Sequence, residues 1–193
     1  MTIYLIRHTE VAVGRAICYG GSDVELADNY AEQLAHIRTV LPAPPDVIWS
    51  SPLRRCSVLA HDLAPPGVDV NFDDRLREYH CGHWEGLPWA DIPRAALDPW
   101  MADFVDVAPP GGETFRALFD RVSAFWHEQI MPLADDTAHQ TVYVVTHGGV
   151  IRTLLCLFLD LSLRNAYRLH LDYGAVTKLT VSQGNYLVGY INR

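Results

Sequence analysis

The sequence predicts a three-layer α/β/α sandwich with a mostly parallel central sheet. Short apolar runs typical of buried strands alternate with segments whose apolar residues recur at helical spacing. This alternation is typical of a parallel sheet covered by helices on both faces. The 193 residues, 49% hydrophobic and 20% charged, are enough for one ordinary globular domain. We therefore expect a single domain over residues 1–193.

Strands and helices follow one another in regular order through the first part of the chain. A strand in "TIYLIRH" (residues 2–8) precedes a helix from about Tyr30 to Leu41, whose apolar residues share one face. The runs "PDVIWSS" (45–51) and "VDVNF" (68–72) flank a second helix. The pattern predicts three strands joined by two helices.

The second half begins with a stretch of a different character. Residues 73–112, rich in Trp, Pro, Gly and His, show little periodicity and predict an irregular insertion with a short helix near residues 92–104. An amphipathic helix follows and ends before Pro132. The stretch "TVYVVTHGGVIRTLLCLFL" (141–159) predicts a buried strand, a Gly-Gly turn and an apolar helix. Two final strands, joined around residues 183–185, predict an antiparallel hairpin at one side of the sheet.

Composition limits the partners and the compartment. The four cysteines show no paired spacing, and the longest apolar stretch is shorter than a membrane span. Only six residues precede Arg7, too few for the apolar region of a secretory signal, so we expect a cytoplasmic protein without a membrane partner, either monomer or homodimer. The net charge of −8 argues against nucleic acid. An anionic small molecule is the expected partner, held by a local cluster of basic groups.

Basic side chains stand where three predicted strands end. Arg7 and His8 close the first strand, His147 follows "TVYVVT", and "SSPLRR" places Arg54 and Arg55 after the second strand. Ligands of open α/β sheets collect at the carboxyl ends of the strands. Only one of the two adjacent arginines can readily point inward, because they share one helical turn. We therefore expect two imidazoles and at least one guanidinium to converge.

Such a cluster suits phosphoryl transfer. A neutral imidazole is a nucleophile, guanidinium groups match phosphate oxygens, and the Gly148–Gly149 turn adds backbone N–H groups at a helix N-terminus. Positioning and charge stabilisation carry most of this chemistry, so neither a metal nor a cofactor is required. An alkoxide leaving group needs a proton donor, for which Glu78 and Glu85 are both candidates.

Five motifs together resemble the histidine phosphatase superfamily, in its phosphoglycerate mutase-like branch: "LIRHTE", "SSPLRR", "LREYHCGHWEG", "PPGGET" and "VVTHGGVIR". The resemblance covers most of the chain. It implies that His8 is the phosphorylated nucleophile, that Arg7, Arg55 and His147 hold the phosphate, and that Glu78 rather than Glu85 is the acid and base. The first helix departs from the family pattern, because Ala27 and Tyr30 replace its usual Thr or Ser and Gly; we expect Asp28 to cap this helix instead.

Further stretches, "CYGGSDVEL" and "LDYGAVTKL" among them, are similar to the α-ribazole phosphatase group of that superfamily. This likeness implies hydrolysis of α-ribazole 5′-phosphate in cobalamin biosynthesis. A broad-specificity sugar or nucleotide phosphatase is the main alternative. A phosphoglycerate mutase and a non-catalytic phosphate-binding module are two others.

Two further sets of side chains have a functional and a structural interpretation. Five aromatic residues could line a pocket for a flat heterocycle. We expect one or two of these residues to touch substrate and the others to belong to the core. They are Tyr19, Trp84, Trp89, Trp100 and Tyr173. The "HCGH" stretch, residues 80–83, has three potential metal ligands but no second cluster at metal-ligand spacing, so we interpret it as loop sequence.

Overall fold

The computed structural model describes residues 1–135, 141–182 and 185–193. Within these ranges one six-stranded sheet has the order β3-β2-β4-β1-β5-β6. Its strands are β1 (Thr2–Arg7), β2 (Val47–Ser50), β3 (Val70–Phe72), β4 (Thr141–Thr146), β5 (Val176–Ser182) and β6 (Asn185–Tyr190). β1, β2, β3 and β4 are parallel, whereas β5 runs antiparallel to both β1 and β6. The mostly parallel sheet with a hairpin at one side is confirmed; the turn residues 183–184 lie outside the described ranges.

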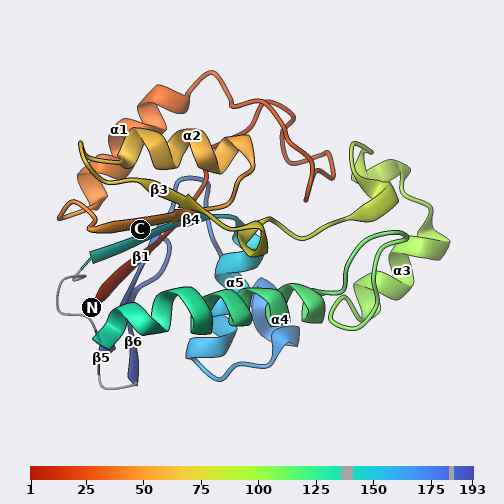
Figure 1. Cartoon of the computed structure of the whole chain (residues 1–193). Helices are drawn as coiled ribbons and strands as arrows, with labels where there is room; N and C mark the ends of the chain where they lie inside the picture. The colour runs from red at the N-terminus through yellow and green to blue at the C-terminus, as the bar shows by residue number, and fades with distance from the viewer. Residues whose placement is uncertain (136–140, 183–184) are drawn as a thin grey trace.

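Helices cover both faces of this sheet (Figure 1). One face carries α1 (Tyr30–Val40) and α2 (Arg54–Leu63), and the opposite face carries α4 (Phe115–Phe125) and α5 (Gly148–Phe158). A π-helical turn, Trp126–Ile130, and a 3₁₀ turn, Met131–Asp135, continue α4. Another 3₁₀ segment, Leu163–Arg168, follows α5. The three-layer sandwich is therefore confirmed.

The core consists of two apolar clusters, one on each side of the sheet. Alternate residues of the central strand β1 divide between them: Ile3 and Leu5 pack with α4 and α5, whereas Tyr4 and Ile6 pack with α1 and α2. All four are 3% exposed or less. A strand buried on both faces must be apolar throughout, which explains why this strand shows no polar alternation. In the described residues no helix is long and apolar enough to cross a membrane.

The expected capping of α1 by Asp28 is wrong. The helix begins after Asn29, and the Asn29 side chain makes no capping bond. Its amide instead donates a hydrogen bond of 2.8 Å to Oε2 of Glu10, on the loop that follows β1. The side chain that stands at the cap position is therefore used to fix this loop against the helix.

Residues 73–112 extend beyond the carboxyl ends of the parallel strands, where α3 (Arg94–Ala102) is farthest from the sheet (Figure 1). Three short 3₁₀ turns precede α3: Asp74–Leu76, Gly82–Trp84 and Trp89–Asp91. The segment is attached to the loop after β1 by backbone hydrogen bonds. Cys18 donates to the Leu87 carbonyl at 2.9 Å, and Trp89 donates to the Ala16 carbonyl at 3.0 Å. Together these two segments enclose the space at the end of the sheet.

Candidate active site

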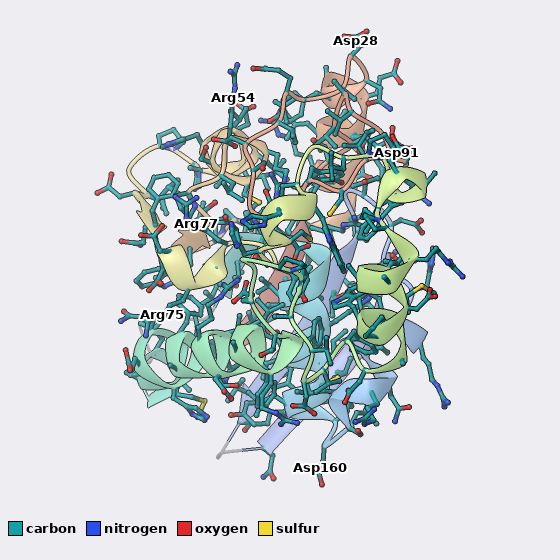
Figure 2. All side chains as sticks on the ribbon, turned by 90° about the vertical axis from the view of Figure 1, so that its right-hand side faces the viewer. Asp28, Arg54, Arg75, Arg77, Asp91 and Asp160 are labelled. Carbon is teal, nitrogen blue, oxygen red and sulfur yellow. The ribbon has the colours of Figure 1, made fainter. Side chains whose placement is uncertain are left out.

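A cavity of about 350 Å³ opens at the carboxyl edge of the sheet. Figure 2 looks onto this edge. Arg7 and His8 line the cavity, brought there by the end of β1. The neighbouring strand β4 ends beside them: Arg7 pairs with Thr146 in the sheet, and the His8 amide donates to the Thr146 carbonyl at 2.9 Å. Sheet register therefore places His8 and His147 side by side, with ring centroids 5.2 Å apart.

The tautomer of His8 follows from one hydrogen bond. Its Nδ1 lies 2.7 Å from the Thr9 carbonyl oxygen, which can only accept, so Nδ1 carries the proton. The Nε2 atom of the neutral ring then carries a lone pair. His8 is 1% exposed, and burial lowers its pKa well below the usual 6.5, with the charges of Arg55 and Arg7 acting in the same direction. His8 is thus a neutral imidazole with a free nucleophilic nitrogen.

Arg7 is held beside His8 by contacts on two sides. Its Nη1 donates to the Leu171 carbonyl at 2.6 Å, and its guanidinium carbon lies 4.1 Å from the centre of the Tyr173 ring. The Tyr173 ring also packs against His8, with centroids 5.5 Å apart. The Arg7 Nε is buried and has no hydrogen-bond partner among the described residues. A buried donor at the edge of a cavity is suited to an anionic ligand.

Arg55 and His147 form a layer behind His8. Both side chains are 0% exposed, and neither lines the cavity. The Arg55 Nε donates to Nδ1 of His147 at 3.2 Å, so the proton of this imidazole is on Nε2, which lies 2.8 Å from the Ser51 hydroxyl. The terminal nitrogens of Arg55 donate to the carbonyls of Ser22 and Gly20, both at 2.7 Å. Burial, the charge of Arg55 and then that of His8 lower the pKa of His147 well below 6.5.

Glu78 reaches the cavity from the segment after β3. Its two carboxylate oxygens accept from the Gly149 amide at 3.1 and 3.0 Å, and Oε1 also accepts from the Tyr79 amide at 2.9 Å. Gly149 lies in the first turn of α5, where the partial positive charge of the helix favours a carboxylate. A Cβ at Gly149 would lie 2.3 Å from Oε1 of Glu78, so glycine is needed for this approach. Gly148, predicted as a phosphate contact, is the preceding residue of that turn.

The structure places the two members of each candidate pair differently. The Arg54 side chain is 57% exposed and pairs with Glu25 at 3.0 Å, and Figure 2 shows it at the periphery of the molecule. Arg55 is the inward arginine. Glu85 accepts hydrogen bonds from the amides of Gly21 at 2.8 Å and Cys81 at 2.9 Å and from the Ser22 hydroxyl, so it ties the loop after β1 to the 73–112 segment. Of the two glutamates only Glu78 lines the cavity.

Aromatic residues make up much of the cavity wall. Of the five predicted candidates, four line it (Tyr19, Trp89, Trp100 and Tyr173), whereas Trp84 is 3% exposed and belongs to the core. The hydroxyls of Tyr19 and Tyr173 lie 2.5 Å apart and join the loop after β1 to the segment before β5. The cavity therefore has an aromatic surface larger than a phosphate group requires.

Metal-ligating side chains are not gathered in the described residues, where no group of three His, Cys, Asp or Glu could hold a metal ion. In the "HCGH" stretch the side chains take separate partners: His80 lies 3.9 Å from Glu85, and the Cys81 thiol faces the Tyr79 carbonyl at 3.8 Å.

Sequence reasoning missed Arg152, a cavity-lining arginine on α5. It stands four residues after Gly148, so the two share one face of the helix. This spacing within "VVTHGGVIR" was the available signal. It also missed Ser51, whose hydroxyl contacts His147 and whose side chain is 0% exposed. No sequence pattern distinguishes that serine from its neighbour Ser50.

Fold and site together define an α/β protein with a pocket lined by basic and aromatic side chains at the carboxyl edge of its sheet. A sequence model described as the histidine phosphatase superfamily (branch 1) matches residues 3–193. The chain belongs to this superfamily, and it is a phosphoric monoester hydrolase.

Curated relatives of three descriptions resemble the chain. A glucosyl-3-phosphoglycerate phosphatase of Mycolicibacterium vanbaalenii is 34% identical over 84% of this chain and 76% of its own length. A putative phosphoserine phosphatase 2 of Hydrogenobacter thermophilus is 25% identical over 99% of this chain and 95% of its own length. The adenosylcobalamin/alpha-ribazole phosphatase of Escherichia coli is 25% identical over 95% of this chain and 91% of its own length.

Solved structures confirm the shared fold. The alpha-ribazole phosphatase from Shigella flexneri matches with a TM-score of 0.89 at 24% identity, over 100% of this chain and 96% of that one. A mycobacterial glucosyl-3-phosphoglycerate phosphatase matches with a TM-score of 0.83 at 28% identity, over 99% of this chain and 98% of that one.

Proposed function

We propose that the enzyme hydrolyses α-ribazole 5′-phosphate through a covalent phosphohistidine on His8. The observation that carries this proposal is the state of the His8 ring: Nδ1 is committed to the Thr9 carbonyl, and Nε2 is unprotonated beside the guanidinium of Arg7 in a cavity. A buried neutral imidazole needs no base to become a nucleophile. The adjacent cation reduces the repulsion between that nucleophile and the phosphate oxygens.

The first step forms a bond between His8 Nε2 and phosphorus while the bond from phosphorus to the ester oxygen breaks. Arg7 contacts the phosphate from the cavity side. Arg55 keeps one unassigned N–H on each terminal nitrogen, and we assign it and His147 to the phosphate as well, together with the Gly148 amide. Glu78, in its protonated form, gives its proton to the departing oxygen.

In the second step water hydrolyses the phosphohistidine. Glu78, now a carboxylate at the N-terminus of α5, takes a proton from water as the water oxygen attacks phosphorus. The bond from phosphorus to Nε2 breaks, which releases inorganic phosphate and restores neutral His8. The scheme requires neither metal nor cofactor.

The aromatic cavity wall supports a substrate with a flat leaving group. Trp89 and Trp100 stack with centroids 6.1 Å apart and both line the cavity, and aromatic surface of this kind suits a flat heterocycle such as benzimidazole. We propose that residues 73–112, as part of a single domain over residues 1–193, supply this substrate-facing wall. The curated relatives named for α-ribazole phosphate support the same choice.

A broad-specificity sugar phosphatase is the second candidate, favoured by the 34% identity to a glucosyl-3-phosphoglycerate phosphatase. A substrate panel distinguishes the two. We expect kcat/KM for α-ribazole 5′-phosphate to exceed that for glycerol phosphate, glucosyl-3-phosphoglycerate and phosphoserine by at least roughly 100-fold. Equal values across the panel would exclude the specific assignment. Enzyme quenched in alkaline denaturant should carry base-stable, acid-labile phosphate on His8, and a chain without such label would exclude the covalent route.

A further inference from the structure

The cavity contains a cation that the proposed mechanism does not use. Arg152 lines it from α5, and no carboxylate of the described residues lies within ion-pair distance of its guanidinium. Among the described residues its one hydrogen bond runs from Nε to the Leu169 carbonyl at 3.1 Å, and its guanidinium carbon lies 5.3 Å from the centre of the Tyr167 ring. Burial lowers its pKa from the usual 12.5. The charge of Glu78 opposes this shift from beyond ion-pair distance, and an anionic ligand in direct contact would stabilise the partly desolvated guanidinium further.

Arg152 is held in the same way as Arg7. The carbonyl of Leu169 anchors Arg152, and the carbonyl of Leu171, two residues further on, anchors Arg7 at 2.6 Å. Each arginine also lies over the ring of a cavity-lining tyrosine, Tyr167 or Tyr173. One short segment between α5 and β5 therefore fixes two guanidinium groups, and it leaves the terminal nitrogens of Arg152 without protein acceptors in the described residues.

The two guanidinium groups flank one glycine. A Cβ built on Gly148 would lie 2.9 Å from Nη1 of Arg152 and 3.3 Å from Nε of Arg7. A side chain at this point would push the Arg152 guanidinium out of its present place. Two like charges so close together repel, and a tetrahedral anion with several oxygens could accept from both at once. The unpaired buried Nε of Arg7 lies on the same side.

We propose that Arg152 is a further phosphate-contacting residue, which binds an oxygen of the phosphoryl group together with Arg7. The ligand class is a tetrahedral dianion: a phosphate monoester before the reaction and inorganic phosphate after it. The identity of the substrate in this inference rests on the proposed function. The binding test does not, because it uses inorganic phosphate and needs no turnover. The alternative ligand for Arg152 is a second acidic group elsewhere on the substrate. The experiments below distinguish this alternative from the phosphoryl group itself.

The experiment measures the binding of inorganic phosphate by calorimetry, without turnover. Replacing Arg152 by Met keeps the length of the stem against Tyr167 and removes the charge. We expect Arg152→Met to raise the Kd of phosphate by roughly 10- to 100-fold, and Arg152→Lys to restore part of the loss, because a point charge replaces a fork of donors. The matched control is Arg54→Met, which removes a positive charge from an exposed position on the same edge of the sheet. It should change the Kd less than twofold.

Steady-state kinetics add a second measurement. kcat/KM of Arg152→Met should fall by a similar factor for p-nitrophenyl phosphate, whose leaving group carries no second acidic group. Phosphate binding within twofold of the native value in a folded Arg152→Met variant would overturn the proposal. So would a loss confined to substrates with an additional carboxylate or phosphate. If the native protein hydrolysed no ester but lost phosphate affinity on this change, the proposed function would fail while the Arg152 site stood.

Discussion

Two layers of basic side chains meet at the end of the sheet, and they are held in opposite ways. In the inner layer Arg55 and His147 are 0% exposed and bonded to each other and to protein acceptors. In the outer layer Arg7 and Arg152 line the cavity, each with one backbone carbonyl as its anchor. His8 lies between the layers. The inner layer is fixed by several hydrogen bonds to the protein before substrate arrives, whereas each outer arginine has a single backbone anchor and more donors left for a ligand. The difference teaches that membership of a basic cluster does not define a role; the number of unsatisfied donors does.

The largest loss of activity is expected on replacing His8, which lies between the two layers. His8→Ala removes the nucleophile, so kcat should fall by at least roughly 10⁴-fold, as in other enzymes that lose a nucleophile. The measurement is steady-state turnover of α-ribazole 5′-phosphate together with phosphate labelling of the quenched enzyme. A folded variant with near-native turnover would contradict the site.

Glu78→Gln should produce the next largest effect, and it should depend on the leaving group. Loss of the proton donor should lower kcat by roughly 10²- to 10⁴-fold for an alkyl phosphate. The loss should be much smaller for p-nitrophenyl phosphate, whose leaving phenolate needs little protonation. Comparing the two esters on one variant tests the role. An equal loss on both would indicate that Glu78 acts only through its hydrogen bonds to the first turn of α5.

Acid should destabilise the folded protein through its two buried histidines, His8 and His147. His8 and His147 have pKa values held below 6.5 by burial and by their arginine neighbours, so between the folded pKa and 6.5 the unfolded chain binds more protons than the folded one. Their contribution is complete above pH 6.5 and is lost as pH falls below it, by about 1.4 kcal/mol per histidine for each pH unit down to the folded pKa. Urea unfolding at pH 7.5, 6.5 and 5.5 measures this loss. His147→Gln should reduce the slope below pH 6.5, and an unchanged slope would contradict the assignment.

Ser51→Ala tests whether the inner layer matters for orientation. The variant removes the hydroxyl partner of His147 Nε2 and leaves only the weaker sulfur contact to Cys56 at 3.4 Å among the described residues, so kcat should fall by about tenfold and the free energy of unfolding by about 1 kcal/mol. KM should change little, because Ser51 does not line the cavity. Ser57→Ala, on the exposed side of α2, is the matched control. A rise in KM with unchanged kcat would show that Ser51 contacts substrate instead.

Arg54→Ala should have the smallest effect. Its ion pair with Glu25 is solvent-exposed, 57% and 70% for the two side chains, and such pairs contribute roughly 0–1 kcal/mol. Both kcat/KM and the melting temperature should stay near the native values. A tenfold loss of kcat/KM would show that activity depends on long-range charge at this edge of the sheet and not only on residues in contact with the substrate.

Local patterns were sufficient for the fold and for the position of His8, the proposed nucleophile. Apolar runs predicted the strands that end at Arg7-His8 and at His147, and parallel pairing of β1 with β4 then brings the two imidazoles together. The cap of α1 was mispredicted, because the side chain at that position bonds Glu10 on another segment. Pairing of this kind depends on contacts that helical periodicity does not encode.

The sequence by itself determined the order of the elements and which residue types stand at the strand ends, because buried strands and amphipathic helices leave periodic patterns. Only the tertiary structure decided which basic side chains face the cavity. That choice depends on carbonyls far along the chain: Gly20 and Ser22 for Arg55, Leu169 for Arg152 and Leu171 for Arg7. A backbone carbonyl is the same in every residue, so no sequence pattern marks the ones that will hold a guanidinium in place.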